Sequence, residues 1–191
     1  MKELVFLLEE LSAQALLEGL LPRCLHPTIT PRYIPFQGKQ DLDKQVERKL
    51  RGYLNPNARF LILRDQDSAD CHTVKAGLLA KCAAAGRAPV SVVRIACREL
   101  ETFYLADLAA VGAAFGLPRL AEQQERAKYR TPDRLGAPSQ ELATLTRQQY
   151  QKVSGSRQLG EYLDPENTRS VSFKHLMAGI RRLEGELLAL S

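Results

Sequence analysis

Acidic side chains follow an apolar segment in the stretch RFLILRDQDSADC, residues 59–71. Asp65, Asp67 and Asp70 stand within six residues of one another, directly after the apolar run 60–63. Like charges held close together cost free energy unless a cation, a basic partner or water offsets them. A hard divalent cation such as Mg²⁺ takes oxygen ligands and keeps several waters, so two or three carboxylates are enough to hold it. The spacing therefore indicates a metal site at Asp65 and Asp67.

Each of these acids also has a simpler interpretation. Asp70 precedes the helix expected over 72–85, where a carboxylate caps the first turn and interacts well with the helix dipole, and we expect that role for it. For Asp65 with Asp67 we favour metal binding over capping. Glu99 and Glu101 follow another apolar segment, and residues two apart on one helix do not face the same point. We expect one of these two to serve the site and the other to be solvated or paired with a base.

The elements that must position these acids alternate in type along the first 115 residues or so. Apolar or β-branched segments predict strands at 3–8, 29–35, 59–63 and 88–96, with 29–35 at an edge because of its two prolines. Helices are expected from Ser12 onward, over 42–54, over 72–85 and over 97–115. This order predicts an α/β fold: an open, mainly parallel β-sheet flanked by helices. Segments 3–9, 59–64 and 90–95 should be parallel neighbours, which brings Glu9 and Glu10 to the edge that holds Asp65 and Asp67.

The chain changes character after Pro118, and no strong strand pattern follows. We expect a core over residues 1–117 and a helical extension over 118–191 that packs on it. Helices are predicted at 139–152, 157–163 and 173–189, with Ser172 as a cap and Phe173 in the core. The segment KYRTPDRLGAPSQ at 128–140 is predicted to be a loop.

A mild basic bias is compatible with a phosphate-bearing partner, since the net charge is +5 and the pI about 9.1. Candidate phosphate or nucleic-acid contacts are Lys39 beside Gly38, and Arg98, Lys128 and Arg130, with Tyr129 available for base stacking. Solvated surface is the alternative for each. The Gly-x-x-x-x-Gly-Lys-Ser/Thr frame of a P-loop is missing around Lys39.

Two other classes are disfavoured. None of the four cysteines forms a Cys-x-x-Cys pair, so a zinc ribbon is not expected and the thiols are predicted to be reduced. The segment MKELVFLLEELSAQALLEGLL carries four glutamates, which suits neither a signal peptide nor a membrane span. A cytoplasmic protein without a membrane partner is the expectation.

Together these residues resemble the Toprim fold, the metal-binding domain shared by topoisomerases, primases and the overcoming-lysogenization-defect nucleases. Its signature is a Glu that ends the first strand and an Asp-x-Asp that ends a later one, here Glu9 in FLLEELSA and Asp65 and Asp67 in LRDQDSADC. The chain is more closely similar to a bacterial family of small Toprim-like proteins known as a domain of unknown function. That likeness is carried by FLLEELSAQALLEGLLPR, FQGKQDL, LRDQDSADCHTVK, VRIACRELETFYLADL and NTRSVSF, and spans nearly the whole chain.

The resemblance implies a Mg²⁺- or Mn²⁺-dependent nuclease or phosphodiesterase. Glu9, Asp65 and Asp67 would hold the metal, Glu9 would also serve as general acid or base, and Glu99 or Glu101 would complete a second metal site. It further implies an effector of bacterial defence against phage that works with an ATPase partner on DNA or RNA. The first strand of Toprim domains usually ends in Glu-Gly. Here Glu10 follows Glu9 and would repel a phosphate. This departure favours the alternative, a non-catalytic module that binds nucleic acid, a nucleotide or an ATPase. The oligomeric state is left open.

Overall fold

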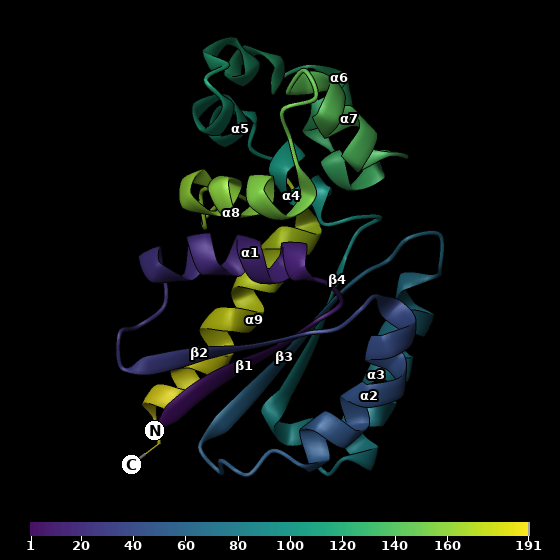
Figure 1. Ribbon diagram of the computed structural model, residues 1–191, viewed down its shortest axis with the longest axis vertical. Helices are drawn as coiled ribbons and strands as arrows, with labels where there is room; N and C mark the ends of the chain where they lie inside the picture. The colour runs from purple at the N-terminus through teal and green to yellow at the C-terminus, as the bar shows by residue number, and fades with distance from the viewer. Residues whose placement is uncertain (191) are drawn as a thin grey trace.

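A four-stranded parallel sheet forms the centre of the molecule in the computed structural model, which describes residues 1–190 (Figure 1). Its strands are β1 (Lys2–Leu8), β2 (Ile29–Pro35), β3 (Ala58–Asp65) and β4 (Ser91–Ala96), in the order β2-β1-β3-β4. All three pairings are parallel, and the register places Leu8 beside Leu63 and Asp65 beside Ala96. The predicted α/β fold is therefore confirmed, with β1, β3 and β4 as neighbours. The proline-containing strand β2 lies at an edge, where missing N–H donors are tolerated.

The two faces of the sheet carry separate apolar clusters because side chains alternate along each strand. Val5, Leu7 and Ile62 face α2 (Lys39–Arg51) and α3 (Cys71–Ala84), which lie together on one side of the sheet (Figure 1). Leu8 and Leu61 belong to the cluster of the opposite face, which is covered by α1 (Leu11–Leu20) and α9 (Val171–Leu188). Both faces of a parallel sheet are thereby covered, as the near-continuous apolar strands require.

The remaining helices form a further layer on the side of α1 that faces away from the sheet, and α8 packs on α1 (Figure 1). They are α4 (Glu101–Leu105), α5 (Leu108–Phe115), α6 (Ala127–Arg130), α7 (Pro138–Leu145) and α8 (Lys152–Tyr162). Short 3₁₀ turns η1 (Leu21–Arg23), η2 (Ala88–Val90), η3 (Pro118–Gln123) and η4 (Pro132–Arg134) connect the longer elements. Within the described residues, no helix has both the length and the apolar character needed to cross a membrane.

The helix predicted over 97–115 is wrong in detail, because it is two helices separated at Asp107. The Asp107 carboxylate accepts hydrogen bonds from the Ala110 N–H at 3.0 Å and from the Asp164 N–H at 2.9 Å. Its own backbone is non-helical, as expected of a residue that caps the next helix. The break therefore ties α5 to the segment that follows α8.

The helical extension was also predicted with errors at its helix boundaries. The segment 128–140 is not a plain loop, since it contains parts of α6, η4 and α7. Ser170, not Ser172, caps α9 by accepting a hydrogen bond from the Phe173 N–H at 3.1 Å. Phe173 is fully buried, as predicted.

The extension contacts the rest of the molecule through close backbone packing. Gly19 of α1 and Gly160 of α8 meet so tightly that a Cβ on Gly160 would lie 2.3 Å from the Leu16 carbonyl oxygen. Helix α9 packs on the sheet face formed by β1, β3 and β4. The division of the chain at residue 117 stays a prediction.

Candidate functional site

A hollow of about 350 Å³ opens at the carboxyl edge of the sheet. Asp65, Asp67, Glu99 and Glu101 line it, so four of the predicted acids meet there. They come from the end of β3 and from the segment that follows β4. The other lining residues are Ser139, Tyr150 and Lys152, which the helical extension contributes.

Glu9 lies beside the hollow and is hydrogen-bonded to the neighbouring strand β3. The Glu9 N–H donates to the Leu63 carbonyl at 3.1 Å, which extends the β1–β3 pairing past the end of β1. A Glu9 carboxylate oxygen accepts a hydrogen bond from the Asp65 N–H at 2.9 Å. The first-strand glutamate is thus held against the first aspartate of Asp-x-Asp.

The two loops that carry Asp67 and Arg98 are fastened to each other. The Asp67 N–H donates to the Arg98 carbonyl at 2.8 Å, and the Arg98 N–H donates to the Gln66 side chain at 3.2 Å. Both residues have φ in the left-handed region, 54° at Asp67 and 62° at Arg98. Such conformations are costly for residues other than glycine, and they concentrate at functional sites.

Glu99 and Glu101 both line the hollow, and the expectation that only one of them serves a metal stays a prediction. Helix α4 begins at Glu101, and Glu99 lies in the turn before it, where the spacing rule for a helix does not apply. The Glu99 carboxylate accepts from the Ser139 N–H at 2.8 Å. Glu101, only 1% exposed, accepts from the Tyr150 hydroxyl at 2.8 Å.

The electrostatics of this edge disfavour full ionisation. Burial raises the pKa of Asp65 well above its usual value, and the nearby charges of Glu9 and Glu101 raise it further. Burial likewise raises the pKa of Glu9, against the hydrogen bond from Asp65, and the Asp67 charge adds to the rise. The pKa of Glu101 is raised chiefly by burial. A cation entering the hollow would reverse these shifts.

Two lysines supply part of the missing positive charge. Lys39, the first residue of α2 rather than a loop residue, donates to the Asp67 carboxylate at 2.8 Å. Lys152 lines the hollow and forms an ion pair with Glu10 at 2.8 Å.

Glu10 does not continue strand β1, so its side chain does not follow the alternation of side chains along that strand. Strand β1 ends at Leu8, and Glu10 is the residue before α1, with an extended backbone. Its carboxylate also accepts a hydrogen bond from the Ser12 hydroxyl at 2.7 Å. Glu10, rather than Ser12, occupies the N-cap position of α1. Glu10 therefore belongs to the charged surroundings of the hollow.

The third aspartate of the opening stretch has a structural role. Asp70 is the N-cap of α3 and accepts hydrogen bonds from the Thr73 N–H and hydroxyl, both at 2.8 Å. The predicted capping role is confirmed. His72 lies in the first turn of the same helix.

The carboxylate oxygens around the hollow suit a hard divalent cation, although these side chains are not arranged as a complete coordination site. In the described part of the chain, no three His, Cys, Asp or Glu side chains are arranged to hold a metal ion. Carboxylate oxygens nevertheless surround the hollow, and those of Glu9, Glu99 and Glu101 each have one oxygen in a hydrogen bond that orients the group. Asp67 would have to exchange Lys39 for the cation.

The basic candidates divide into two groups. Arg98 lines a second hollow of about 310 Å³ together with Asp67 and Glu99. Lys39 lies next to this hollow because it forms an ion pair with Asp67. Lys128 pairs with Glu141, and the Arg130 guanidinium donates to the Glu125 carbonyl. These last two lie on α6 and line neither hollow.

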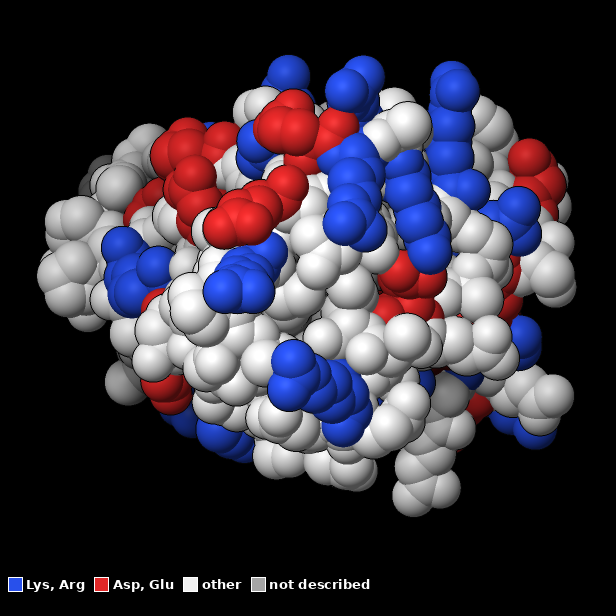
Figure 2. Space-filling model, turned by 90° about the horizontal axis from the view of Figure 1, so that it is seen from above, with Lys and Arg blue, Asp and Glu red and all other residues white. Residues whose placement is uncertain are grey.

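The prediction that Tyr129 is available for base stacking is wrong. Its side chain is only 3% exposed, and its hydroxyl donates to Glu141. The face shown in Figure 2 carries Lys and Arg beside a cluster of Asp and Glu, so its charge is mixed rather than uniformly basic.

Sequence reasoning missed Ser139, Tyr150 and Lys152. The pattern predicted one helix over 139–152, whereas α7 ends at Leu145 and the chain then turns back toward the hollow. No local motif distinguishes these three residues from ordinary surface positions, because their place depends on packing between distant segments.

Comparison with known proteins gives a family and a fold. No curated protein matches the chain. Among solved structures, the C-terminal region of the Burkholderia pseudomallei OLD protein is similar, with a TM-score of 0.57 and 14% identity over 95% of this chain and 98% of that chain. This likeness is one of fold, and supports the Toprim-like architecture. The model of the domain of unknown function DUF4276 matches residues 8–181, and the chain therefore belongs to that family.

Proposed function

We propose that this chain is a Mg²⁺- or Mn²⁺-dependent phosphodiesterase of Toprim type that cuts DNA or RNA. One observation carries the proposal: the carboxylates of Asp65, Asp67, Glu99 and Glu101 line a single hollow at the carboxyl edge of the sheet. In open α/β sheets this edge is where ligands bind. The Toprim-like order of Glu9 and Asp-x-Asp, together with the fold likeness to the OLD region, supports the same reading.

The residues of the hollow have separable roles in this proposal. Asp65 and Asp67 would hold a cation with Glu9, and Glu99 or Glu101 would complete a second position. A bound divalent cation would stabilise charge on the phosphate and lower the pKa of a bound water. The strand-end hydrogen bonds fix where Glu9, Asp65 and Asp67 stand relative to one another, which favours a defined ligand geometry.

Glu9 would act as the general acid or base. In the metal-free protein its pKa is raised by burial and by the Asp67 charge, so this carboxyl binds a proton more readily than an exposed glutamate does. Lys39, once released from Asp67, would be free to contact a phosphate at the mouth of the hollow. Lys152 would contribute positive charge from the opposite wall.

The biological role we propose is that of an effector in bacterial defence against phage, with an ATPase as partner. This part depends on the family resemblance. The helical layer of Figure 1 would be the surface on which such a partner acts, since Ser139, Tyr150 and Lys152 of that part of the chain line the hollow.

The experiment is a cleavage assay on end-labelled single-stranded DNA, duplex DNA and RNA, with Mg²⁺ or Mn²⁺, in the absence and presence of the ATPase. Cutting should require the metal and disappear in Asp65→Ala and Asp67→Ala. A wild-type protein that binds metal but cuts none of these substrates in any combination would contradict the proposal.

A second candidate, a non-catalytic binding module, is favoured by a specific observation. Asp67 is already paired with Lys39, and Glu10 stands where the Toprim domains that this chain resembles usually have glycine. Such a module would bind nucleic acid, a nucleotide or the ATPase without any metal requirement. Binding that is unchanged by chelation and by Asp67→Asn would decide for it.

A further inference from the structure

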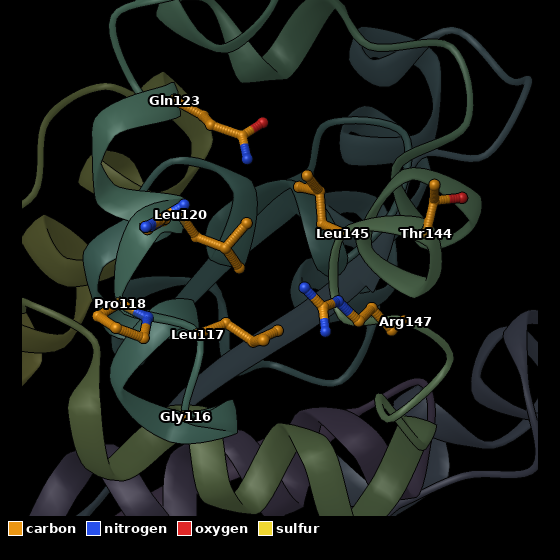
Figure 3. Close-up of a pocket in the computed structure, with 9 residues that line it drawn as sticks. Gly116, Leu117, Pro118, Leu120, Gln123, Thr144, Leu145 and Arg147 are labelled. Carbon is orange, nitrogen blue, oxygen red and sulfur yellow. The ribbon is translucent and has the colours of Figure 1, made fainter.

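Another cavity, separate from both hollows described above, lies between η3 and the end of α7. Its volume is about 610 Å³, within the range of pockets that take small molecules. Leu117 and Leu120 on one wall face Leu145 and Arg147 on the other, with Gln123 at the rim (Figure 3). None of its residues lines the acidic hollow.

The cavity combines an apolar floor with two guanidinium groups. Leucine side chains supply the apolar part, and Arg119 and Arg147 supply the charge. No acidic side chain lines the cavity, and among residues 1–190 neither arginine forms an ion pair. Both guanidinium groups are exposed, so an anionic group in the cavity would gain charge-assisted contacts without breaking an existing ion pair.

The backbone that carries Arg147 is unusual. Arg147 and Gln148 are consecutive non-glycine residues in the left-handed region, with φ of 53° and 65°. The turn is held by the Gln148 N–H, which donates to the Ala143 carbonyl at 2.8 Å. Strained backbone of this kind persists where the surrounding structure fixes it, and is concentrated at ligand sites. Here it directs the Arg147 side chain toward Leu117 and Leu120 across the cavity (Figure 3).

We propose that this cavity is a binding site for a small amphiphilic anion, with its apolar body against Leu117, Leu120 and Leu145 and its anionic group between Arg119 and Arg147. The occupant is a small molecule, because the volume of about 610 Å³ is that of a small-molecule pocket. A carboxylate, sulfonate or phosphate would serve as the head group, since each offers oxygens to a guanidinium fork.

The site is connected to the acidic hollow by a short segment. Three residues after Arg147, the Tyr150 N–H donates to the Thr146 hydroxyl at 3.2 Å, and the Tyr150 hydroxyl donates to Glu101. An occupant that fixes Arg147 therefore fixes the start of the segment that reaches the proposed metal site. The binding proposal itself does not depend on the proposed activity.

A pair of fluorescent probes tests the anion requirement. Anilinonaphthalene sulfonate is an aromatic body with one anionic group, and N-phenyl-1-naphthylamine is the same body without it. We expect the wild-type protein to bind one molecule of the sulfonate, at least about tenfold more tightly than the neutral probe, as one charge-assisted contact implies. High salt should weaken only the sulfonate.

Exposed arginines give the matched variants. Arg119→Gln with Arg147→Gln should reduce the preference for the sulfonate to about threefold or less, while Arg126→Gln, an exposed arginine that does not line the cavity, should leave it unchanged. Circular dichroism checks that all variants fold. Absence of saturable one-to-one binding would overturn the proposal, as would equal affinity for the two probes or equal loss in Arg126→Gln.

Discussion

Replacing Glu9 by Gln separates the proposed catalytic role of this residue from a structural one. The amide is nearly the same size as the carboxylate, and its oxygen can still accept the hydrogen bond that the Asp65 N–H donates at 2.9 Å. The change removes a charge from a place where burial and the Asp67 charge raise the pKa. We therefore expect the metal-free protein to fold normally and to be as stable as the wild type or slightly more stable.

The expected magnitudes differ greatly between stability and activity. Relief of a partly solvated repulsion is worth up to about 1 kcal/mol, or roughly 2–4 °C in melting temperature for a chain of this length. Loss of a general acid or base, or of a metal ligand, should lower cleavage about 100-fold or more, which is about 2.7 kcal/mol of transition-state stabilisation. A merely structural Glu9 would give the reverse pattern.

Two measurements on the same preparation decide the matter. Thermal melting in chelator reports stability, and single-turnover cleavage of labelled nucleic acid with saturating Mg²⁺ or Mn²⁺ reports chemistry. Glu161→Gln is a suitable control, because Glu161 is an exposed residue of α8 outside the hollow. Glu10→Gln is not an inert control, since it breaks the ion pair with Lys152.

The reasoning fails if Glu9→Gln lowers the metal-free melting temperature by more than about 4 °C, the size of a lost structural contact. It also fails if cleavage survives at near wild-type rate while Glu161→Gln and wild type behave alike.

Further outcomes follow from the same contacts. Asp65→Asn should stabilise the metal-free protein by an amount that is near zero around pH 4 and grows as pH rises. The reason is the raised pKa of Asp65, which means that the wild type loses stability as pH climbs through that pKa. Melting curves from pH 4 to 8 with and without Mg²⁺ check this expectation, and a gain that shrinks with pH would contradict it. Lys39→Met should tighten Mg²⁺ binding several-fold in calorimetry, since Asp67 no longer exchanges an ammonium for the cation, and weaker binding would show that Lys39 is not a competitor. Asp70→Ala should lower the melting temperature by roughly 2–4 °C through loss of the bond from Thr73 and leave Mg²⁺ affinity unchanged.

Much of the sheet edge could be predicted because its determinants are local. Apolar strands alternating with helices leave few topologies, and parallel strands bring their carboxyl ends together. The placement of Asp65 and Asp67 at the end of β3 follows from the run 60–63 alone. Asp70 was predictable for the same reason, since a cap depends on residues three positions away.

The rest of the hollow could not be predicted because it depends on distant contacts and on a helix boundary. That Glu99 and Glu101 both line the hollow depends on α4 beginning at Glu101 rather than at residue 97, and helix starts are set by packing as much as by sequence. Tyr150 and Lys152 reach the hollow only because the chain turns back after α7.

The charge balance of this edge explains how so many acids can end buried strands. Six carboxylates lie in or beside the hollow, and two lysines are bonded to them; the acids are Glu9, Glu10, Asp65, Asp67, Glu99 and Glu101. Both lysines pair with the more peripheral acids, Asp67 and Glu10, which leaves Asp65 and Glu9 to respond by a raised pKa. Because these pKa values are raised, a divalent cation that binds here would compete with protons for the carboxylates. Metal binding at this site should accordingly release protons, and weaken as pH falls toward the ordinary carboxyl range. Calorimetric titration with Mg²⁺ in buffers of different ionisation enthalpy would measure that release directly, and a binding heat independent of the buffer would show that the acids are already ionised.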